Sequence, residues 1–230
     1  MKIAVITCYD QNDYVRARVL RTAFAAVPGV EALVIRNENK GLLRYLEVPY
    51  KILVARFKQR LDAYVIAFRG YEMLPFVLAV KGRKPLIFDE FINAAEYLEE
   101  HNKLNTKSGI GKFFVKAYAW LLSRCRFILA DTQAHADYSA KLCGLPVEKF
   151  RAIPVGTDES LFHAAPKTSA AAHKPFTVFF YGNGMTPLHG LNYLLDAAIM
   201  LKDNPNITFN LVGGKEKGET ACNAAIAKGA

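Results

Sequence analysis

The stretch RFILADTQAHADYSAKLCGLPVEKFRAIPVGTDESLF, residues 126–162, shows how the chain is divided. It opens with the apolar run 127–130, which lacks polar alternation and is typical of a parallel strand buried on both faces. Asp131-Thr132 ends that run with residue types that favour helix N-caps. A short helix is predicted over 134–142, and a second apolar run follows at 150–155. Strand, capped helix and strand in this order predict a βαβ unit.

The residues after this unit differ in composition. His163 to Lys174 (HAAPKTSAAAHK) is rich in small residues, contains proline and almost lacks large apolar side chains, as expected of an exposed linker. A new strand–turn–helix pattern begins at Pro175. The sequence therefore predicts an N-terminal domain over 1–162, a linker over 163–174 and the beginning of a second domain over 175–230.

Strands alternate with helices before residue 126. We expect strands at 2–9, 30–35, 62–68 and 86–88, and helices at 14–26, 40–61, 74–80 and 109–124. The first helix is expected to carry Arg16, Arg18 and Arg21 on its polar side. This alternation predicts an α/β fold with a doubly wound, mostly parallel sheet, in which ligands bind outside the carboxyl ends of the strands.

The second domain shows fewer elements. We expect strands at 176–181 and 207–212 and helices at 191–201 and 220–227. Two strands and two helices cannot bury a doubly wound sheet, so this domain is expected to be incomplete as written.

The composition is that of a basic globular protein. Of 230 residues, 52% are hydrophobic and 22% are charged, which excludes a disordered chain. The formal net charge of +9 favours an anionic partner such as a nucleotide, a nucleic acid or a membrane surface. No run reaches the ~18 apolar residues of a membrane span, and no signal-peptide pattern follows Met1. Separated cysteines without a CxxC pair favour free thiols in a reducing cytosol. We expect a cytoplasmic protein, free or at the inner face of the membrane.

Several segments resemble GT-B glycosyltransferases of the family-4 (group 1) type. The inter-domain pattern of that family, a lysine and an apolar strand followed by Pro, Gly, Asp and Phe, is similar to Lys149–Asp158 with Phe162. The first turn of its donor domain resembles Tyr181-Gly182, Pro187 and His189-Gly190, and its acceptor-side strand end is similar to Phe88–Phe91. The resemblance implies the GT-B fold, in which two Rossmann-like domains hold the acceptor and the donor, and it implies that the chain ends within the donor domain.

The resemblance also implies an activity. It indicates transfer of a hexose-type sugar from a nucleotide-diphosphate sugar to a hydroxyl of a glycan or lipid-linked acceptor, with retention of anomeric configuration. The residues expected to bind the donor are Gly182, Asn183, Gly184, His189, Gly190, Gly213 and Gly214. The residues expected at the acceptor or in the cleft are Asp10, Asp13, Arg69, Gly70, Asp131, Thr132, Gly156 and Asp158.

Asp89 and Glu90 are the predicted catalytic residues. They stand at a predicted strand end between Phe88 and Phe91, where partial burial raises a carboxyl pKa or holds the group against a substrate hydroxyl. The alternative for Asp89 is a helix N-cap, and the same alternative holds for Asp131-Thr132. A tight turn is the alternative for the glycines after the strand at 176–181.

The sequence departs from the family pattern at three places. Asn183 and His189 stand where the family places an arginine and a lysine that clamp the donor diphosphate. The carboxylate motif Glu-x7-Glu does not occur within these 230 residues, and Asp10–Asp13 replaces a glycine-rich loop. The chain by itself is therefore expected to bind donor poorly and to turn over little. No Asp-x-Asp pair and no metal-ligand spacing of histidines occurs, so we expect no metal and no cofactor beyond the nucleotide sugar.

Two other function classes remain open. One is a GT-B-like binding protein without catalysis. The other is a basic α/β protein associated with membranes or nucleic acid, although no RRM, KH or helix-turn-helix signature supports nucleic acid. The helix at 109–124 bears on this choice, because basic residues flank its aromatic side chains. The basic residues are Lys103, Lys107, Lys112, Lys116, Arg124 and Arg126, and the aromatic residues are Phe113, Phe114, Tyr118 and Trp120. Such a helix lies on anionic lipid, or it turns its aromatic stripe to the core and its lysines to solvent.

Overall fold

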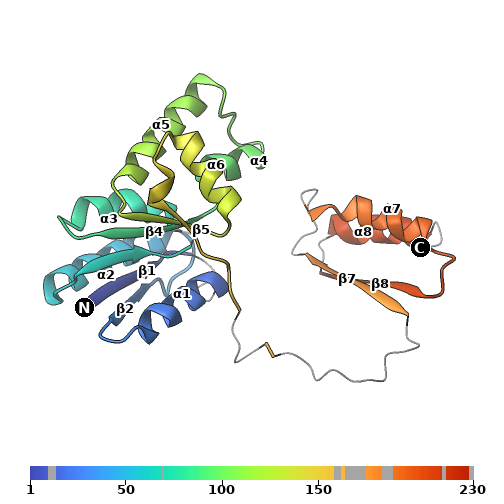
Figure 1. Cartoon of the computed structure of the whole chain (residues 1–230), viewed down its shortest axis with the longest axis horizontal. Helices are drawn as coiled ribbons and strands as arrows, with labels where there is room; N and C mark the ends of the chain where they lie inside the picture. Colours follow the sequence, from blue (N-terminus) through green and yellow to red (C-terminus); the bar gives the residue numbers. More distant parts are fainter. Residues whose placement is uncertain are drawn as a thin grey trace. The chain divides into compact units, whose positions relative to one another are not determined.

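The computed structural model describes residues 1–9, 14–68, 70–157, 162–163, 175–182, 189–213 and 216–227, with only the backbone of 216–218. The chain divides into two compact units, Met1–His163 and Ala164–Ala230, which are described separately (Figure 1). Of the predicted linker, only His163 is among the described residues.

The described part of the first unit contains a six-stranded sheet and its connecting helices. The strands are β1 (Lys2–Thr7), β2 (Glu31–Arg36), β3 (Ala63–Ile66), β4 (Leu86–Phe91), β5 (Phe127–Ala130) and β6 (Phe150–Ala152). The α-helices are α1 (Val15–Ala26), α2 (Arg44–Lys58), α3 (Leu74–Val80), α4 (Ala94–Glu100), α5 (Gly109–Ser123) and α6 (Gln133–Cys143). The 3₁₀ turns are η1 (Gly41–Leu43), η2 (Tyr71–Met73) and η3 (Val147–Lys149).

The sheet confirms the predicted doubly wound α/β fold. Its strand order is β2-β1-β3-β4-β5-β6, and every pairing is parallel. β2 lies on one side of β1, and β3 and the later strands lie on the other side. The strand order therefore reverses between β1 and β3. The carboxyl ends at such a reversal form the usual ligand-binding crevice of an open α/β sheet.

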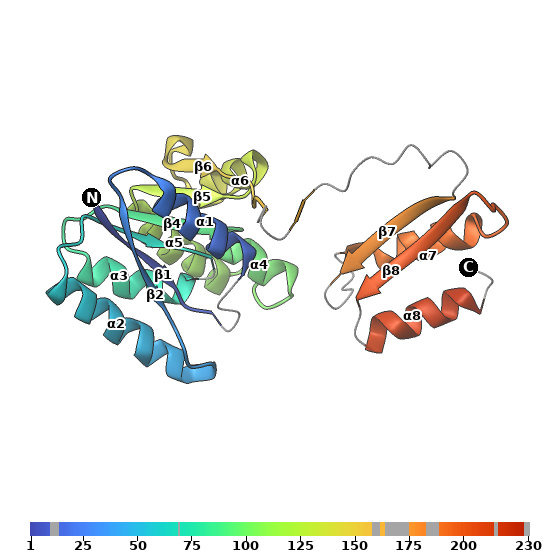
Figure 2. The same cartoon turned by 90° about the horizontal axis from the view of Figure 1, so that it is seen from below.

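The helices cover the two faces of the sheet unequally. Residues of α2, α3, α5 and α6 share one large buried cluster with the strands, which contains Ile52, Leu74 and Leu122. The opposite face is covered by α1, whose Ala17 and Leu20 pack against Ala67 and Leu129 (Figures 1 and 2). Each side of the central strands is therefore dry, which explains their unbroken apolar sequences.

Most predicted elements appear with shifted ends. β4 runs to Phe91 and not to residue 88, so Asp89 and Glu90 lie inside the strand. β6 ends at Ala152, and the predicted helix 40–61 consists of η1 and α2. The helix predicted from residue 220 begins earlier, as α8 (Glu216–Ile226). The interpretation of Asp89 as a helix N-cap is wrong, because the side chain of Asn93 caps α4 by accepting from the Ala95 N–H.

Arg16 corrects the expected polar face of α1. Its side chain is buried, with 1% of the residue exposed, whereas Arg18 and Arg21 are half-buried. The sequence contained a signal for this position, because Arg16 precedes Leu20 and Phe24 by four and eight residues and so lies on the helix face that packs on the sheet.

The second unit begins with a two-stranded parallel sheet. It contains β7 (Phe176–Gly182), α7 (Leu191–Met200), β8 (Ile207–Gly213) and α8 (Glu216–Ile226). α7 and α8 pack together over one face of the strand pair through Leu191, Leu195 and Ala225. On the other face Phe179 and Tyr181 are 61% and 76% exposed.

Helix α5 divides the aromatic residues of its segment between the core and solvent. Phe114 packs against the large cluster and Tyr118 is buried in it. Phe113 and Trp120 are 74% and 57% exposed. The core-facing interpretation is thus correct for Phe114 and Tyr118 and wrong for Phe113 and Trp120. Among the described residues, no helix is long and apolar enough to cross a bilayer.

We predict that Gly111→Ala destabilises the first unit. A Cβ at Gly111 would lie 2.0 Å from the backbone oxygen of Asn105, so the first turn of α5 would have to move away from the preceding loop. We expect a loss of about 1–3 kcal/mol in the free energy of unfolding, measured by urea titration. Gly109→Ala in the same turn is the control, because a Cβ there meets nothing within 4 Å. Equal stabilities for the two variants would contradict the prediction.

Candidate functional site

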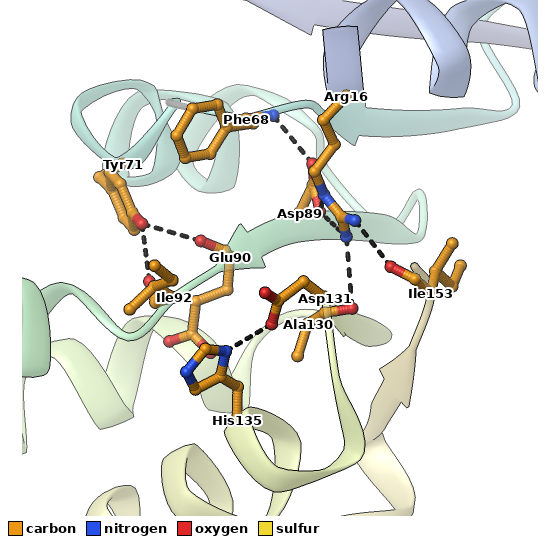
Figure 3. A network of polar contacts seen from close by, with 10 residues as sticks. All are labelled: Arg16, Phe68, Tyr71, Asp89, Glu90, Ile92, Ala130, Asp131, His135 and Ile153. Carbon is orange, nitrogen blue, oxygen red and sulfur yellow. Dashed lines mark hydrogen bonds and ion pairs between the residues drawn. The ribbon is translucent and has the colours of Figure 1, made fainter. Parts of the chain in front are cut away.

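The carboxyl edge of the six-stranded sheet is held by one buried guanidinium (Figure 3). Nε of Arg16 donates to both oxygens of Asp89, at 2.8 and 3.0 Å, and Nη2 donates to Oδ1 at 2.6 Å. The remaining contacts are with backbone oxygens: Nη1 lies 2.7 Å from that of Ile153, and Nη2 lies 3.3 Å from that of Ala130. Arg16 therefore ties the first turn of α1 to β4 and to the ends of β5 and β6.

Asp89 is fully engaged in this network. Besides Arg16, the backbone N–H of Phe68 donates to Oδ2 at 3.1 Å, and 1% of the residue is exposed. Burial raises the pKa of the Asp89 carboxyl, while Arg16 and the Phe68 N–H act to lower it. The bidentate contact with a guanidinium is the geometry of a charged pair. The Asp89 carboxylate faces Arg16 and not solvent.

Glu90 lies in a different environment, on the side of the sheet that α5 and α6 cover. Its Oε1 accepts from the hydroxyl of Tyr118 at 2.9 Å and from Nδ2 of Asn93 at 3.1 Å. Asn93 Nδ2 also donates to Oγ of Ser139 at 2.8 Å. Burial raises the pKa of Glu90 to about 7, because only neutral donors compensate its charge. The catalytic role predicted for Asp89 and Glu90 stays a prediction, and neither carboxylate is accessible to solvent.

Four half-buried aromatic rings, Tyr9, Tyr14, Phe68 and Phe91, gather where the strand order reverses; we name them the edge rings. Tyr9 follows β1 and Phe68 follows β3, with centroids 6.3 Å apart, and Tyr14 and Phe91 each lie 4.7 Å from Phe68. Phe91 has a φ of 65°, which is rare for a residue with a Cβ. The strand register shifts between Asp89 and Phe91, so a β-bulge carries this ring to the edge.

Asp131 and Thr132 follow β5 at the same edge. The Thr132 hydroxyl accepts from the N–H of His135 at 3.2 Å, so Thr132 is the N-cap of α6. Asp131 Oδ1 contacts Nδ1 of His135, and the two side chains are 16% and 34% exposed (Figure 3). Burial lowers the pKa of His135, but the carboxylates of Asp131 and Glu96 outweigh it, and the pKa is raised above its usual value. This partly exposed pair can exchange hydrogen bonds with a hydroxyl.

Two predicted glycines have a structural role at this edge. A Cβ at Gly70 would lie 2.1 Å from Cγ2 of Ile66, so the turn into η2 tolerates no side chain. Gly156 has a φ of +73°, and a Cβ there would lie 3.1 Å from Cγ1 of Val19. Both are explained by packing without a ligand.

The second unit gathers four predicted donor residues at the carboxyl edge of β7 and β8. Gly182 and Gly213 are paired in register as the last residues of the two strands. Gly213 has a φ of +102°, and a Cβ there would lie 2.5 Å from the Gly182 oxygen. A Cβ at Gly182 would lie 3.4 Å from Nδ1 of His189, and Gly190, with a φ of +69°, precedes α7. An imidazole and a helix N-terminus thus lie beside backbone that carries no side chain.

The remaining predicted site residues lie outside the described part of the chain. They are Asp10, Asp13, Arg69, Asp158, Asn183, Gly184 and Gly214. Among the residues that the structure describes, no group of His, Cys, Asp and Glu side chains is arranged to hold a metal ion.

Sequence reasoning missed the buried Arg16, the edge rings and the contact of His135 with Asp131. The spacing of Asp131 and His135, four residues apart across a helix start, was a usable signal for the last of these. The edge rings come from separate segments, and only the strand order brings them together.

We predict that Arg16→Met costs about 3–5 kcal/mol of unfolding free energy, because it leaves Asp89 buried without its partner. The double variant Arg16→Met/Asp89→Leu should recover much of this loss, since no charge is then left unpaired. Urea unfolding followed by circular dichroism measures both. Arg83→Met, at an exposed arginine of the same unit, is the control, and a loss as small as in this control would refute the assigned role of Arg16.

Glu90 predicts a pH dependence of stability. Because the folded-state pKa is raised from 4.5 to about 7, the folded protein keeps this proton while the unfolded chain has lost it. The contribution of Glu90 to the free energy of unfolding is therefore fully present below pH 4.5. It is lost as the pH rises to about 7, and the loss amounts to up to about 3 kcal/mol. Glu90→Gln removes this ionisation, so its unfolding midpoint should exceed that of the unsubstituted chain at pH 8 more than at pH 5. Parallel pH curves would contradict the assignment.

The chain was compared with protein families, curated proteins and solved structures. No protein-family model and no curated protein matches the chain. A crystal structure of Anabaena HepE in complex with UDP and glucose matches over 99% of this chain, with a TM-score of 0.62 and 16% sequence identity. The chain spans 65% of the length of that structure. The glycotransferase of kitacinnamycin matches over 91% of this chain and 65% of its own, with a TM-score of 0.41 and 12% identity. The likeness to HepE shows the fold of this chain, and this fold agrees with the GT-B fold that the sequence resemblance implies.

Proposed function

We propose that this chain is the acceptor domain and the first part of the donor domain of a nucleotide-sugar glycosyltransferase. One observation carries the proposal: Gly182, His189, Gly190 and Gly213, four predicted donor residues, meet at one strand edge of the second unit. HepE, which shares the fold, was crystallised with UDP and glucose, and this supports a nucleoside-diphosphate sugar as the donor.

The chemistry of the second-unit edge suits a diphosphate. Strand-end glycines let backbone amides approach an anion, and the N-terminus of α7 contributes a positive partial charge. The imidazole of His189 adds a hydrogen-bond donor beside Gly182. The family that the sequence resembles has an arginine and a lysine where this chain has Asn183 and His189, and such fixed cations would bind phosphate more strongly. We therefore expect a modest affinity for the diphosphate.

We propose a retaining transfer without a metal ion, as in the family that the sequence resembles. The acceptor hydroxyl oxygen bonds to the anomeric carbon, the bond from that carbon to the diphosphate oxygen breaks, and the hydroxyl proton passes to the departing diphosphate. The work of the protein is then positioning and stabilisation of the diphosphate charge.

The first unit supplies the acceptor side in this proposal. The partly exposed Asp131 and His135 are placed to bind acceptor hydroxyls, on a glycan or a lipid-linked sugar. The burial of Asp89 and Glu90 supports a positioning role for both, since their carboxylates meet only protein groups. Because the family's Glu-x7-Glu pair is not among these residues, we propose that the 230-residue chain binds donor weakly and turns over little.

Ligand-observed NMR of the 230-residue chain with UDP, GDP and ADP tests the donor assignment. We expect saturation transfer to at least one of the three, and about tenfold weaker binding in His189→Ala from the loss of a charge-assisted hydrogen bond. Met200→Ser, at the 83% exposed far end of α7, is the matched control. A folded chain that binds none of the three, or binds equally after His189→Ala, would overturn the donor assignment.

A further inference from the structure

Helix α5 exposes a stripe of large apolar side chains. Its buried residues are Gly111, Tyr118 and Leu122. On the opposite side Ile110, Phe113 and Trp120 are 78%, 74% and 57% exposed. Their spacings of three and seven residues place them in one line along the helix. The core already uses Phe114 and Tyr118, so packing within this unit does not account for the outward stripe.

The charged residues of the α5 segment itself have one sign. No aspartate or glutamate occurs between residues 101 and 130, whereas Lys107, Lys112 and Lys116 lie on or just before α5 and are exposed. At the end of the helix the Arg124 guanidinium stacks 4.7 Å from the Trp120 ring centroid. A tryptophan with a cation over its ring suits the polar–apolar boundary of a membrane, where the ring is buried and the cation meets phosphate.

The neighbouring helices continue this character. α5 packs against α3, and α3 packs against α2. Trp120 lines a pocket together with Pro75 and Ala79 of α3. Beyond it, α2 exposes Tyr50 and Phe57 by 68% and 81%. The outer surface of this helix layer is thus apolar and basic together.

We propose that the outward face of α5 is a docking surface for an anionic lipid bilayer. The helix lies flat, with Ile110, Phe113 and Trp120 in the boundary between headgroups and acyl chains. Lys107, Lys112 and Lys116 remain at the lipid phosphates. An exposed apolar line bordered by cations is the pattern of interfacial helices, and each lysine near an anionic surface adds about 1 kcal/mol. A nucleic acid would satisfy the charge but not the aliphatic Ile110.

This inference goes beyond sugar transfer, because it concerns where the protein works and not the reaction. It also differs from the function proposed above in what it requires. Vesicle binding needs neither nucleotide nor acceptor, so either proposal can fail while the other stands.

Trp120 is the single tryptophan of the chain and reports directly on this surface. The full chain is titrated with vesicles of phosphatidylcholine alone and with equimolar phosphatidylcholine and phosphatidylglycerol. We expect a blue shift of tryptophan emission, and quenching by brominated acyl chains, with the anionic vesicles only. High salt should weaken the binding, because part of it is electrostatic.

Variants separate the apolar and the electrostatic contributions to vesicle binding. Phe113→Ser keeps the reporter and should weaken partitioning about tenfold, from the lost burial of one aromatic side chain. Lys112→Gln/Lys116→Gln should weaken it by roughly tenfold or more. Tyr193→Ser, an 82% exposed aromatic on α7, is the matched control and should bind as the unsubstituted chain does.

Several results would overturn the proposal. They are an unshifted tryptophan spectrum with both vesicles, equal binding to neutral and anionic vesicles, and equal binding by Phe113→Ser and the Tyr193→Ser control. A shift of Trp120 emission by polyuridylate, with none by anionic vesicles, would assign the surface to nucleic acid instead.

Discussion

The buried contact between Arg16 and Asp89 is the constraint on which the first unit depends. The N–H groups of a guanidinium removed from water need hydrogen-bond acceptors. For Arg16 these acceptors lie on β4, at the end of β5 and just after β6. A buried pair of this kind gains little net stability, because desolvation offsets the attraction. We therefore interpret it as a device for specificity: it holds α1 and three strand ends in one arrangement at the edge where open α/β sheets usually bind ligands.

The consequences extend along β4. Because neighbouring residues of a strand point to opposite faces, Asp89 meets a cation under α1 while Glu90 enters the layer beneath α5 and α6. One carboxyl is paired with a full positive charge, and the other receives only neutral donors. The bulge that follows brings Phe91 to the edge rings, where Arg16 lies 5.2 Å from its ring centroid. Two adjacent acidic residues thus take different electrostatic roles.

The two units place their functional groups by the same rule. In each, the strands of a parallel sheet end at one edge, and the candidate site residues lie at or just after these strand ends. The first unit presents aromatic rings and the Asp131–His135 pair. The second presents glycine backbone and an imidazole. Rings and hydroxyl-binding groups suit a sugar acceptor, and bare backbone suits a diphosphate.

The sequence by itself determined the order of strands and helices, the parallel sheet and the GT-B resemblance. Those properties depend on local patterns: apolar runs such as 127–130, the N-cap at Thr132 and the glycines at 182 and 213. Only the tertiary structure decided which charged groups are paired with each other. Arg16 and Asp89 are 73 residues apart, and their pairing needs β1, β3 and β4 to be neighbours. Charge pairing and strand order depend on contacts between distant segments, which local patterns do not contain.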